Sequence, residues 1–421
     1  MSTAPSKPRR VRPRVLTSIV AAAVLSSIAT SALAGGLYVN EFSTTAQANA
    51  GAGRGAWVPD ASAALLNPAT MTVLEDHSFA TGFTIAAGNV EFDPAPSSPS
   101  GTSSGGNQAG VAPIASLNYV HRVSDRVRAG LSFYSVSGSI LDPSNSWAGR
   151  FQMTEIALLT ISISPTIAIE VTDWLSIGGG PIATYGSLDW DLRVDFPLGN
   201  ENQLRLEEFD DWQAAGRVGL HLRPTDTLSF GLYYNSETDF DLSGSVSGPL
   251  GATPNLDVDL PLAQFVEASA AWQVNDRITL LATFNWEDWS AADDLTLTAG
   301  GVTRGATTGF RDTYKFGLGM NYQYDEKLLL QTGFTIDTSP LKNRDRIASL
   351  PIDQQFRIAA GFQYDVNASL TLGGSFVYVN FGQGEIRKPT VVGDFGDNDV
   401  FALGMTLAFK ELPWSGRLTV D

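Results

Sequence analysis

The chain has no cysteine among its 421 residues. An exported protein of this length could form disulfides, so its fold must be stable without them. Histidine is also scarce: His77, His121 and His221 lie far apart and form no recognisable metal pattern. We therefore expect no metal. No Ser–His–Asp arrangement stands out around these histidines, so an enzyme is not expected either.

Basic residues are few and unevenly placed. The first 34 residues contain five of the 27, followed by an apolar stretch and an Ala-x-Ala site at 32–34. This pattern predicts a signal peptide over residues 1–34. The remaining chain has 22 basic and 44 acidic residues, a net charge of −22. This balance argues against nucleic acid as a partner, because nucleic acid requires a basic face.

Beyond the leader, the sequence also lacks any apolar run of about eighteen residues, the length that a membrane-spanning helix needs. Apolar residues nevertheless make up 43% of the chain, and glycine is abundant at 41 residues. An exported, cysteine-free, glycine-rich chain without spanning helices is typical of a transmembrane β-barrel. We expect an all-β protein in the cell outer membrane.

A repeat of about fifty residues supports the barrel. Six short turns rich in Asp, Asn and Ser, which favour tight turns, recur along the chain, each followed by an alternating run. A propeller of this period would need four short strands per blade. Here each period holds only two long runs and one long polar loop, which predicts an array of hairpins. The turns are 123–125, 171–173, 224–226, 274–276, 324–326 and 365–367.

Alternation predicts fourteen antiparallel strands. In the run that contains Tyr314, Phe316 and Leu318, apolar side chains share one face, and Lys315 and Gly317 share the other. A period of two places one set on lipid and the other in the lumen. The predicted strands are 77–92, 110–122, 127–139, 153–170, 174–193, 211–223, 227–245, 260–274, 277–294, 311–324, 327–338, 353–365, 368–384 and 397–410.

Aromatic residues near the ends of these runs predict girdles at the membrane interfaces, with Trp147, Trp212 and Trp289 toward the loops. Segments such as 93–109 and 193–210 are predicted as long outer loops. The third strand contains no proline, so a kink there would rest on Gly130 or Gly138.

Residues 35–76 lack a strand pattern and predict an N-terminal hatch, or plug, inside the barrel of residues 77–410. Asp60 is a good N-cap for a short helix over 61–66. The motif Asn67-Pro68-Ala69 predicts a second short helix, with Asn67 as N-cap and Pro68 at the first helical position. Residues 411–421 form a C-terminal tail.

Several motifs, in their order and spacing, resemble the FadL/TodX family of outer-membrane hydrocarbon transporters. The hatch matches through Asn40-Glu41-Phe42, through 63–66 and through Asn67-Pro68-Ala69. The barrel matches at 147–150, 230–234, 286–290, 311–313, 332–340 and 351–357. The resemblance therefore covers nearly the whole exported chain.

The resemblance implies a fourteen-stranded barrel closed by an N-terminal hatch. It implies passive transport of hydrophobic compounds without ATP or another cofactor, with long-chain fatty acids expected before small aromatic hydrocarbons. Ligands would be captured at extracellular loops, held in an inner pocket gated by the hatch, and released laterally where a strand is kinked. The hatch and gate residues would be Asn40, Glu41, Asn67, Pro68 and Ala69.

A fatty acid would need a cation near the pocket to hold its carboxylate. Arg150, Arg311 and Arg357 are candidates, and Phe42 is a candidate ligand contact or a packing residue. Alternatively, the arginines pair with acids predicted in the lumen, which include Glu267, Asp312 and Asp353.

A general porin, or a structural or adhesive barrel, is the alternative function. The hatch discriminates against it, because an open porin does not need forty plug residues. We also expect contacts with outer-membrane lipid and lipopolysaccharide, and a monomer.

Overall fold

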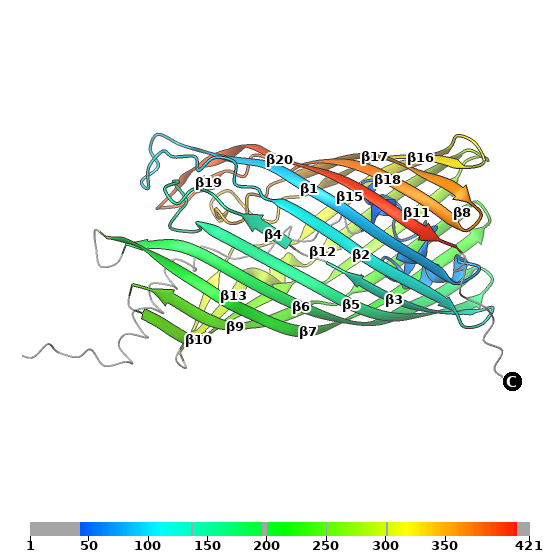
Figure 1. Cartoon of the computed structure of the whole chain (residues 1–421), viewed down its shortest axis with the longest axis horizontal. Helices are drawn as coiled ribbons and strands as arrows, with labels where there is room; N and C mark the ends of the chain where they lie inside the picture. Colours follow the sequence, from blue (N-terminus) through cyan, green and yellow to red (C-terminus); the bar gives the residue numbers. More distant parts are fainter. Residues whose placement is uncertain (1–42, 136–137, 196–199, 250, 300–301, 411–421) are drawn as a thin grey trace, which may run out of the picture.

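A computed structural model describes residues 43–135, 138–195, 200–249, 251–299 and 302–410. The predicted signal peptide, the Asn40-Glu41-Phe42 motif and the tail 411–421 lie outside the described residues. Twenty strand segments form a single antiparallel sheet, and pairing of β1 with β20 closes it into a barrel (Figure 1).

The barrel has fourteen strands, as the alternation predicted. Nine are single segments: β1 (Ser78–Pro94), β2 (Val111–Arg122), β5 (Glu155–Thr172), β6 (Leu175–Asp195), β7 (Glu201–Thr225), β16 (Leu328–Asp337), β17 (Gln355–Asn367), β18 (Leu370–Asn380) and β20 (Val392–Phe409). Five consist of two segments: β3 (Val127–Tyr134) with β4 (Gly138–Leu141), β8 (Leu228–Asn235) with β9 (Thr238–Gly248), β10 (Gly251–Leu262) with β11 (Phe265–Gln273), β12 (Ile278–Glu287) with β13 (Asp294–Ala299), and β14 (Val302–Thr307) with β15 (Thr313–Gln323). The short β19 (Ile386–Arg387) pairs with β20.

The predicted faces are confirmed. Phe316 and Leu318 are 52% and 68% exposed on the outer surface, whereas their neighbour Lys315 faces the lumen and is 7% exposed. Trp212 is exposed, as a girdle residue should be. The girdle prediction is wrong for Trp147 and Trp289, which are fully buried because both pack into an apolar core above the membrane-spanning part.

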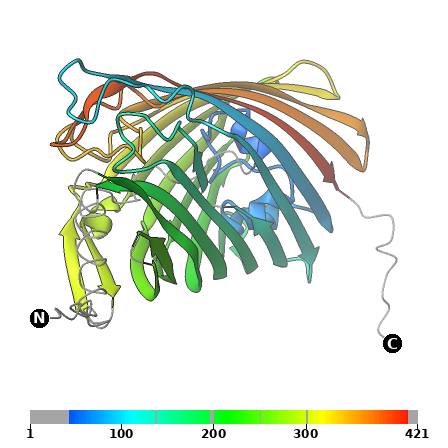
Figure 2. The same cartoon turned by 60° about the vertical axis from the view of Figure 1, so that its left-hand side comes forward.

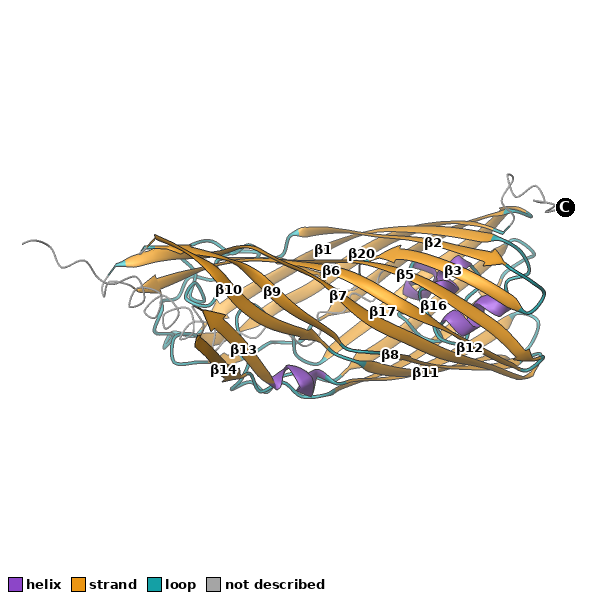
Figure 3. Cartoon of the chain, turned by 90° about the horizontal axis from the view of Figure 1, so that it is seen from below, coloured by secondary structure: helices purple, strands orange, loops and turns teal. Residues whose placement is uncertain are grey.

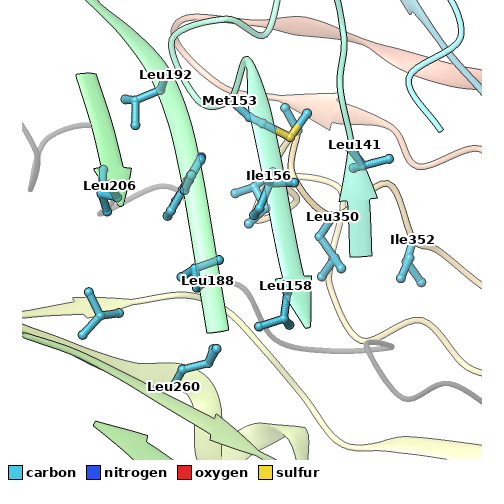
Figure 4. Packing of buried hydrophobic residues seen from close by; sticks show 14 of the residues in the cluster. Leu141, Met153, Ile156, Leu158, Leu188, Leu192, Leu206, Leu260, Leu350 and Ile352 are labelled. Atoms are coloured by element: carbon cyan, nitrogen blue, oxygen red, sulfur yellow. The ribbon is translucent and has the colours of Figure 1, made fainter. Parts of the chain in front are cut away.

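This outer core also explains a second error. Residues 193–210 were predicted as a loop, but β6 continues to Asp195 and β7 begins at Glu201, so the hairpin extends far outward. Its apolar residues alternate and face inward, where they pack with Trp147, Trp289 and residues of other outer segments. Figure 4 shows part of this packing, with Leu188 and Leu192 of β6 near Leu206 of β7 and Ile156 of β5.

Three short helices lie inside the barrel, toward the end with the short turns (Figures 2 and 3). They are α2 (Thr44–Gln47) and the 3₁₀ helices η1 (Ala61–Ala64) and η2 (Pro68–Val73). A fourth, η3 (Trp289–Asp293), lies in an outer loop. Among the described residues, no helix is long and apolar enough to cross a membrane.

Candidate ligand-binding site and hatch

The two predicted hatch helices are present as short 3₁₀ helices with the predicted caps. Asp60 accepts a hydrogen bond from the Ser62 amide at 2.8 Å, and Asn67 Oδ1 accepts one from the Ala69 amide at 3.2 Å. The side-chain Nδ2 of Asn67 also donates to the Gly55 carbonyl at 2.8 Å and to the Leu220 carbonyl of β7 at 3.0 Å. Asn67 therefore caps a helix and attaches the hatch to the barrel wall.

Glycines in the wall let the hatch backbone approach closely. A Cβ added at Gly231 of β8 would collide with the Gly55 carbonyl oxygen, and one at Gly333 of β16 with that of Asn49. A Cβ at Gly178 of β6 would collide with the backbone at Ala69. At these three positions the hatch is therefore docked by its main chain.

Replacing Gly231 with alanine is expected to displace the hatch, because rigid backbone atoms of Gly55 occupy the place of the new methyl group. We expect a loss of about 1–3 kcal/mol in the free energy of hatch docking, measured by amide hydrogen exchange of residues 49–56. Gly216→Ala in β7 is the matched control, because a Cβ there has no atom within 4 Å. Equal exchange in both variants would contradict backbone docking.

One buried ion pair also joins hatch and wall. The guanidinium of Arg54 lies 2.5 Å from Glu267 of β11, and the two side chains are 5% and 0% exposed. Burial alone would lower the pKa of Arg54, but the Glu267 carboxylate raises the pKa above its usual value. Arg54 thus stays charged inside the barrel, and its pairing fixes the Gly-rich segment 51–55.

Above the hatch lies an apolar cavity of about 390 Å³, within the range of about 300–1,000 Å³ for ligand pockets. Arg357 of β17 borders it, among apolar residues that include Leu158, Val379 and Ala402. Arg357 is 5% exposed and lies 2.5 Å from Asp337 of β16. Its charge is therefore compensated by an acid of the wall.

The cavity continues into a gap in the wall between β2 and the third barrel strand. Ser116 pairs with Tyr134, the last residue of β3, and Ala109 bridges Leu141 at the end of β4. Within the described chain, 111–115 pair with β1 but with neither β3 nor β4. The Ala109–Leu141 bridge continues the register of the Ser116–Tyr134 pair.

Side chains from both faces of the wall line the cavity. Ile114 and Leu158 are 8% and 2% exposed and face the lumen, whereas Ile140 and Leu159 are 46% and 51% exposed on the outer surface. The cavity therefore reaches from the lumen to the lipid-facing side. Of the two glycines considered for a kink, Gly138 lies at the break.

Gly130 has a different structural role. A Cβ there would collide with Met71 and Ala64 of the hatch, so the glycine makes room for the plug. A sequence signal for the gap was present on the neighbouring strand: Pro113 of β2 lacks an amide hydrogen and borders the cavity. Proline is confined to positions where no ladder hydrogen bond is donated.

The other candidate residues do not meet at the cavity. Arg150 lies among the outer loops, 2.7 Å from Glu201 and 4.5 Å above the ring of Phe151. Arg311 is exposed, and its Nε donates to the Ser339 carbonyl at 2.9 Å. Phe42, Asn40 and Glu41 lie outside the described residues.

Comparison with known proteins decides the family. A family model described as "Outer membrane protein transport protein (OMPP1/FadL/TodX)" matches residues 25–409. The chain belongs to this family. It is a transporter family and not an enzyme class, and its members are located in the outer membrane. The described part of this FadL/TodX-family chain contains no group of three His, Asp or Glu side chains able to hold a metal ion.

Relatives of this FadL/TodX-family chain include a long-chain fatty acid transport protein of Escherichia coli O6:H1. The two are 25% identical over 88% of this chain and 94% of the relative. Among solved structures, a Pseudomonas aeruginosa FadL homologue has a TM-score of 0.78 at 20% identity, covering 89% of this chain and 98% of that one. The Ralstonia pickettii toluene transporter TbuX has a TM-score of 0.67 at 18% identity, covering 87% and 97%.

Proposed function

We propose that the protein carries hydrophobic compounds, long-chain fatty acids first among them, passively across the outer membrane. The observation that carries this proposal is the apolar cavity that reaches from the lumen to the lipid-facing surface beside β2 and β4. The name of the Escherichia coli relative supports a fatty acid, and the name of TbuX supports the wider class of apolar ligands.

The proposed route has three stages. Ligand is captured among the extracellular loops, where Arg150 and Arg311 offer cations to a carboxylate. It then occupies the cavity bordered by Arg357, with the hatch start, including Asn40, Glu41 and Phe42, as the gate. It leaves sideways through the gap. An apolar ligand gains from this exit because it enters hydrocarbon directly and avoids the aqueous periplasm.

Closing the gap with a disulfide should stop transport. The shared register places Ala112 opposite Gly138, and the chain has no native cysteine to interfere. Under oxidation, cells with Ala112→Cys and Gly138→Cys should take up labelled oleate no faster than cells lacking the protein. Reduction should restore uptake.

The control disulfide joins Ala109→Cys to Leu141→Cys, which already bridge in the closed part of the wall. Oxidation should leave oleate uptake by cells with this control variant unchanged. Normal uptake through the oxidised 112–138 variant, with the disulfide demonstrated by mass spectrometry, would contradict lateral release. Normal uptake of both oleate and toluene by cells lacking the protein would contradict the transport proposal itself.

The hatch argues against a general porin, because residues 43–74 occupy the lumen at the end with the short turns. Contacts with lipopolysaccharide and a monomeric state stay predictions.

A further inference from the structure

A second, smaller pocket lies between the hatch and the wall at the end of the barrel with the short turns. Its volume is about 190 Å³, below the range of about 300–1,000 Å³ for ligand pockets, and it offers room for one large side chain. The hatch contributes Trp57, Pro59 and Asp60, and the wall contributes residues of β15, β16, β17, β18 and β20. A group that fills this pocket therefore contacts hatch and wall at once.

The lining of this pocket combines apolar surface with charges that lack an ion-pair partner. Asp60 is 6% exposed, and its carboxylate accepts hydrogen bonds from two neutral donors, the Thr45 hydroxyl at 2.7 Å and the Ser62 amide at 2.8 Å. Among the described residues, Asp60 forms no salt bridge, and neither does Lys327 at the exposed rim. The pocket is thus complementary to a segment that carries an aromatic ring and charges of both signs.

Strand β20 leads directly from this pocket into the C-terminal tail, residues 411–421. Thr406, Ala408 and Lys410 of this strand line the pocket, and Lys410 is the last residue that the structure describes before the tail. The strand ends at the same end of the barrel as the hatch helices (Figure 1). The tail therefore starts at the rim of the pocket and has no distance to cross to reach it.

The sequence of the tail matches the pocket. It contains one aromatic residue, Trp414, and one basic residue, Arg417, together with acids at both of its ends. Trp414 is four residues beyond Lys410, a reach of about 13–14 Å in an extended chain. Pro413 and Gly416 on either side of Trp414 are residue types that favour turns, as a segment that folds back requires.

We propose that the C-terminal tail folds back over this end of the barrel and places Trp414 in the pocket, with Arg417 toward the carboxylate of Asp60. The tail then contacts hatch and wall together and stabilises the docked plug. The competing occupant is the segment 35–42, which has aromatic residues but no arginine or lysine to compensate Asp60. The inference concerns how the plug is retained, and it does not depend on which ligand is transported.

Disulfide trapping in the purified full-length protein tests the position of the tail, because the chain has no native cysteine. Gln323→Cys in the pocket, combined with Ser415→Cys beside Trp414, should form a disulfide under mild oxidation, detected by mass spectrometry. The matched control pairs Ser415→Cys with Asp226→Cys, in an exposed turn between β7 and β8 outside the pocket. The control pair should stay reduced, and equal disulfide yields for the two pairs would overturn the proposal.

Thiol reactivity without a cross-link tests which side chain fills the pocket. Gln363→Cys introduces a single thiol into the lining. With the tail unaltered, this thiol should react with a charged maleimide about tenfold or more slowly than when Trp414 is also replaced by serine, because a buried aromatic ring must first return to water. Trp414→Phe should retain most of this protection, and Thr419→Ala, in the same tail, is the control that should leave the rate unchanged.

The remaining outcomes contradict the proposal in distinguishable ways. Protection of the thiol that survives both Trp414→Ser and removal of residues 411–421 would assign the pocket to another segment, such as 35–42. Fast reaction in every variant would show that the pocket is open to solvent. Gel mobility of unheated samples shows that each variant is a folded barrel, so neither result can be attributed to unfolding.

Discussion

Deletion of residues 35–74 is expected to open the lumen to reagents from the end with the short turns. Ser269 of β11 is 5% exposed and accepts a hydrogen bond from the Gly55 amide at 3.2 Å, so the hatch covers it. Since the chain has no cysteine, Ser269→Cys introduces a single thiol. A charged maleimide should leave it unlabelled in the full chain and label it nearly completely after the deletion.

Asn275→Cys, in an exposed turn at the same end, is the matched control and should be labelled with or without the hatch. Gel mobility of unheated samples shows whether the deleted variant is still a folded barrel, which we expect because strand pairing closes the sheet through β1 and β20. A folded deletion variant whose thiol at position 269 stays unreactive would contradict the plug interpretation.

Arg54→Gln is expected to release the hatch locally while the barrel stays folded. The change leaves the carboxylate of Glu267, 0% exposed, without its ion-pair partner. Breaking one side of a buried pair costs about 3–5 kcal/mol, so the amides of Gly53 and Gly55 should exchange about a hundredfold faster or more. Both amides now donate to wall hydroxyls, at 2.8 Å and 3.2 Å.

Replacing both Arg54 and Glu267 with leucine should slow the exchange of these two amides again, because no unpaired charge is then buried. Arg126→Gln is the control for loss of an ion pair at the surface. Arg126 and Asp173 are 62% and 95% exposed, so the expected change in the free energy of unfolding is within about 1 kcal/mol. Slow exchange in Arg54→Gln would show that docking depends on the main-chain contacts alone.

The barrel was predictable because its signal is local and repeated. Each strand must alternate to face lipid and lumen, so Phe316 and Leu318 reveal their face from sequence alone. Turn chemistry located the short connections at six places. The caps Asp60 and Asn67 were predictable for the same reason, because a cap depends on its nearest neighbours.

The failures are contacts between segments distant in sequence. Trp147 and Trp289 are tryptophans near the ends of predicted strands, as girdle residues are. Only contacts with the folded outer segments bury them. Residues 193–210 are polar enough to predict a loop, yet the inward-facing leucines extend the hairpin. Arg54 was visible only as part of a glycine-rich segment, because its partner Glu267 lies 213 residues away.

Motifs select candidate arginines, but whether an arginine is already paired depends on its three-dimensional neighbourhood. Arg357, which the sequence did suggest, borders the cavity but is already paired with Asp337.

The wall glycines have a consequence for how such barrels diverge. At Gly231, Gly333 and Gly178 the wall accommodates hatch main chain, which is the same whatever side chains the hatch carries. At these three positions the wall therefore specifies where the plug lies. A hatch transplanted from another member should dock in this barrel as long as the three wall glycines are kept and the new hatch carries side chains equivalent to Arg54 and Asn67.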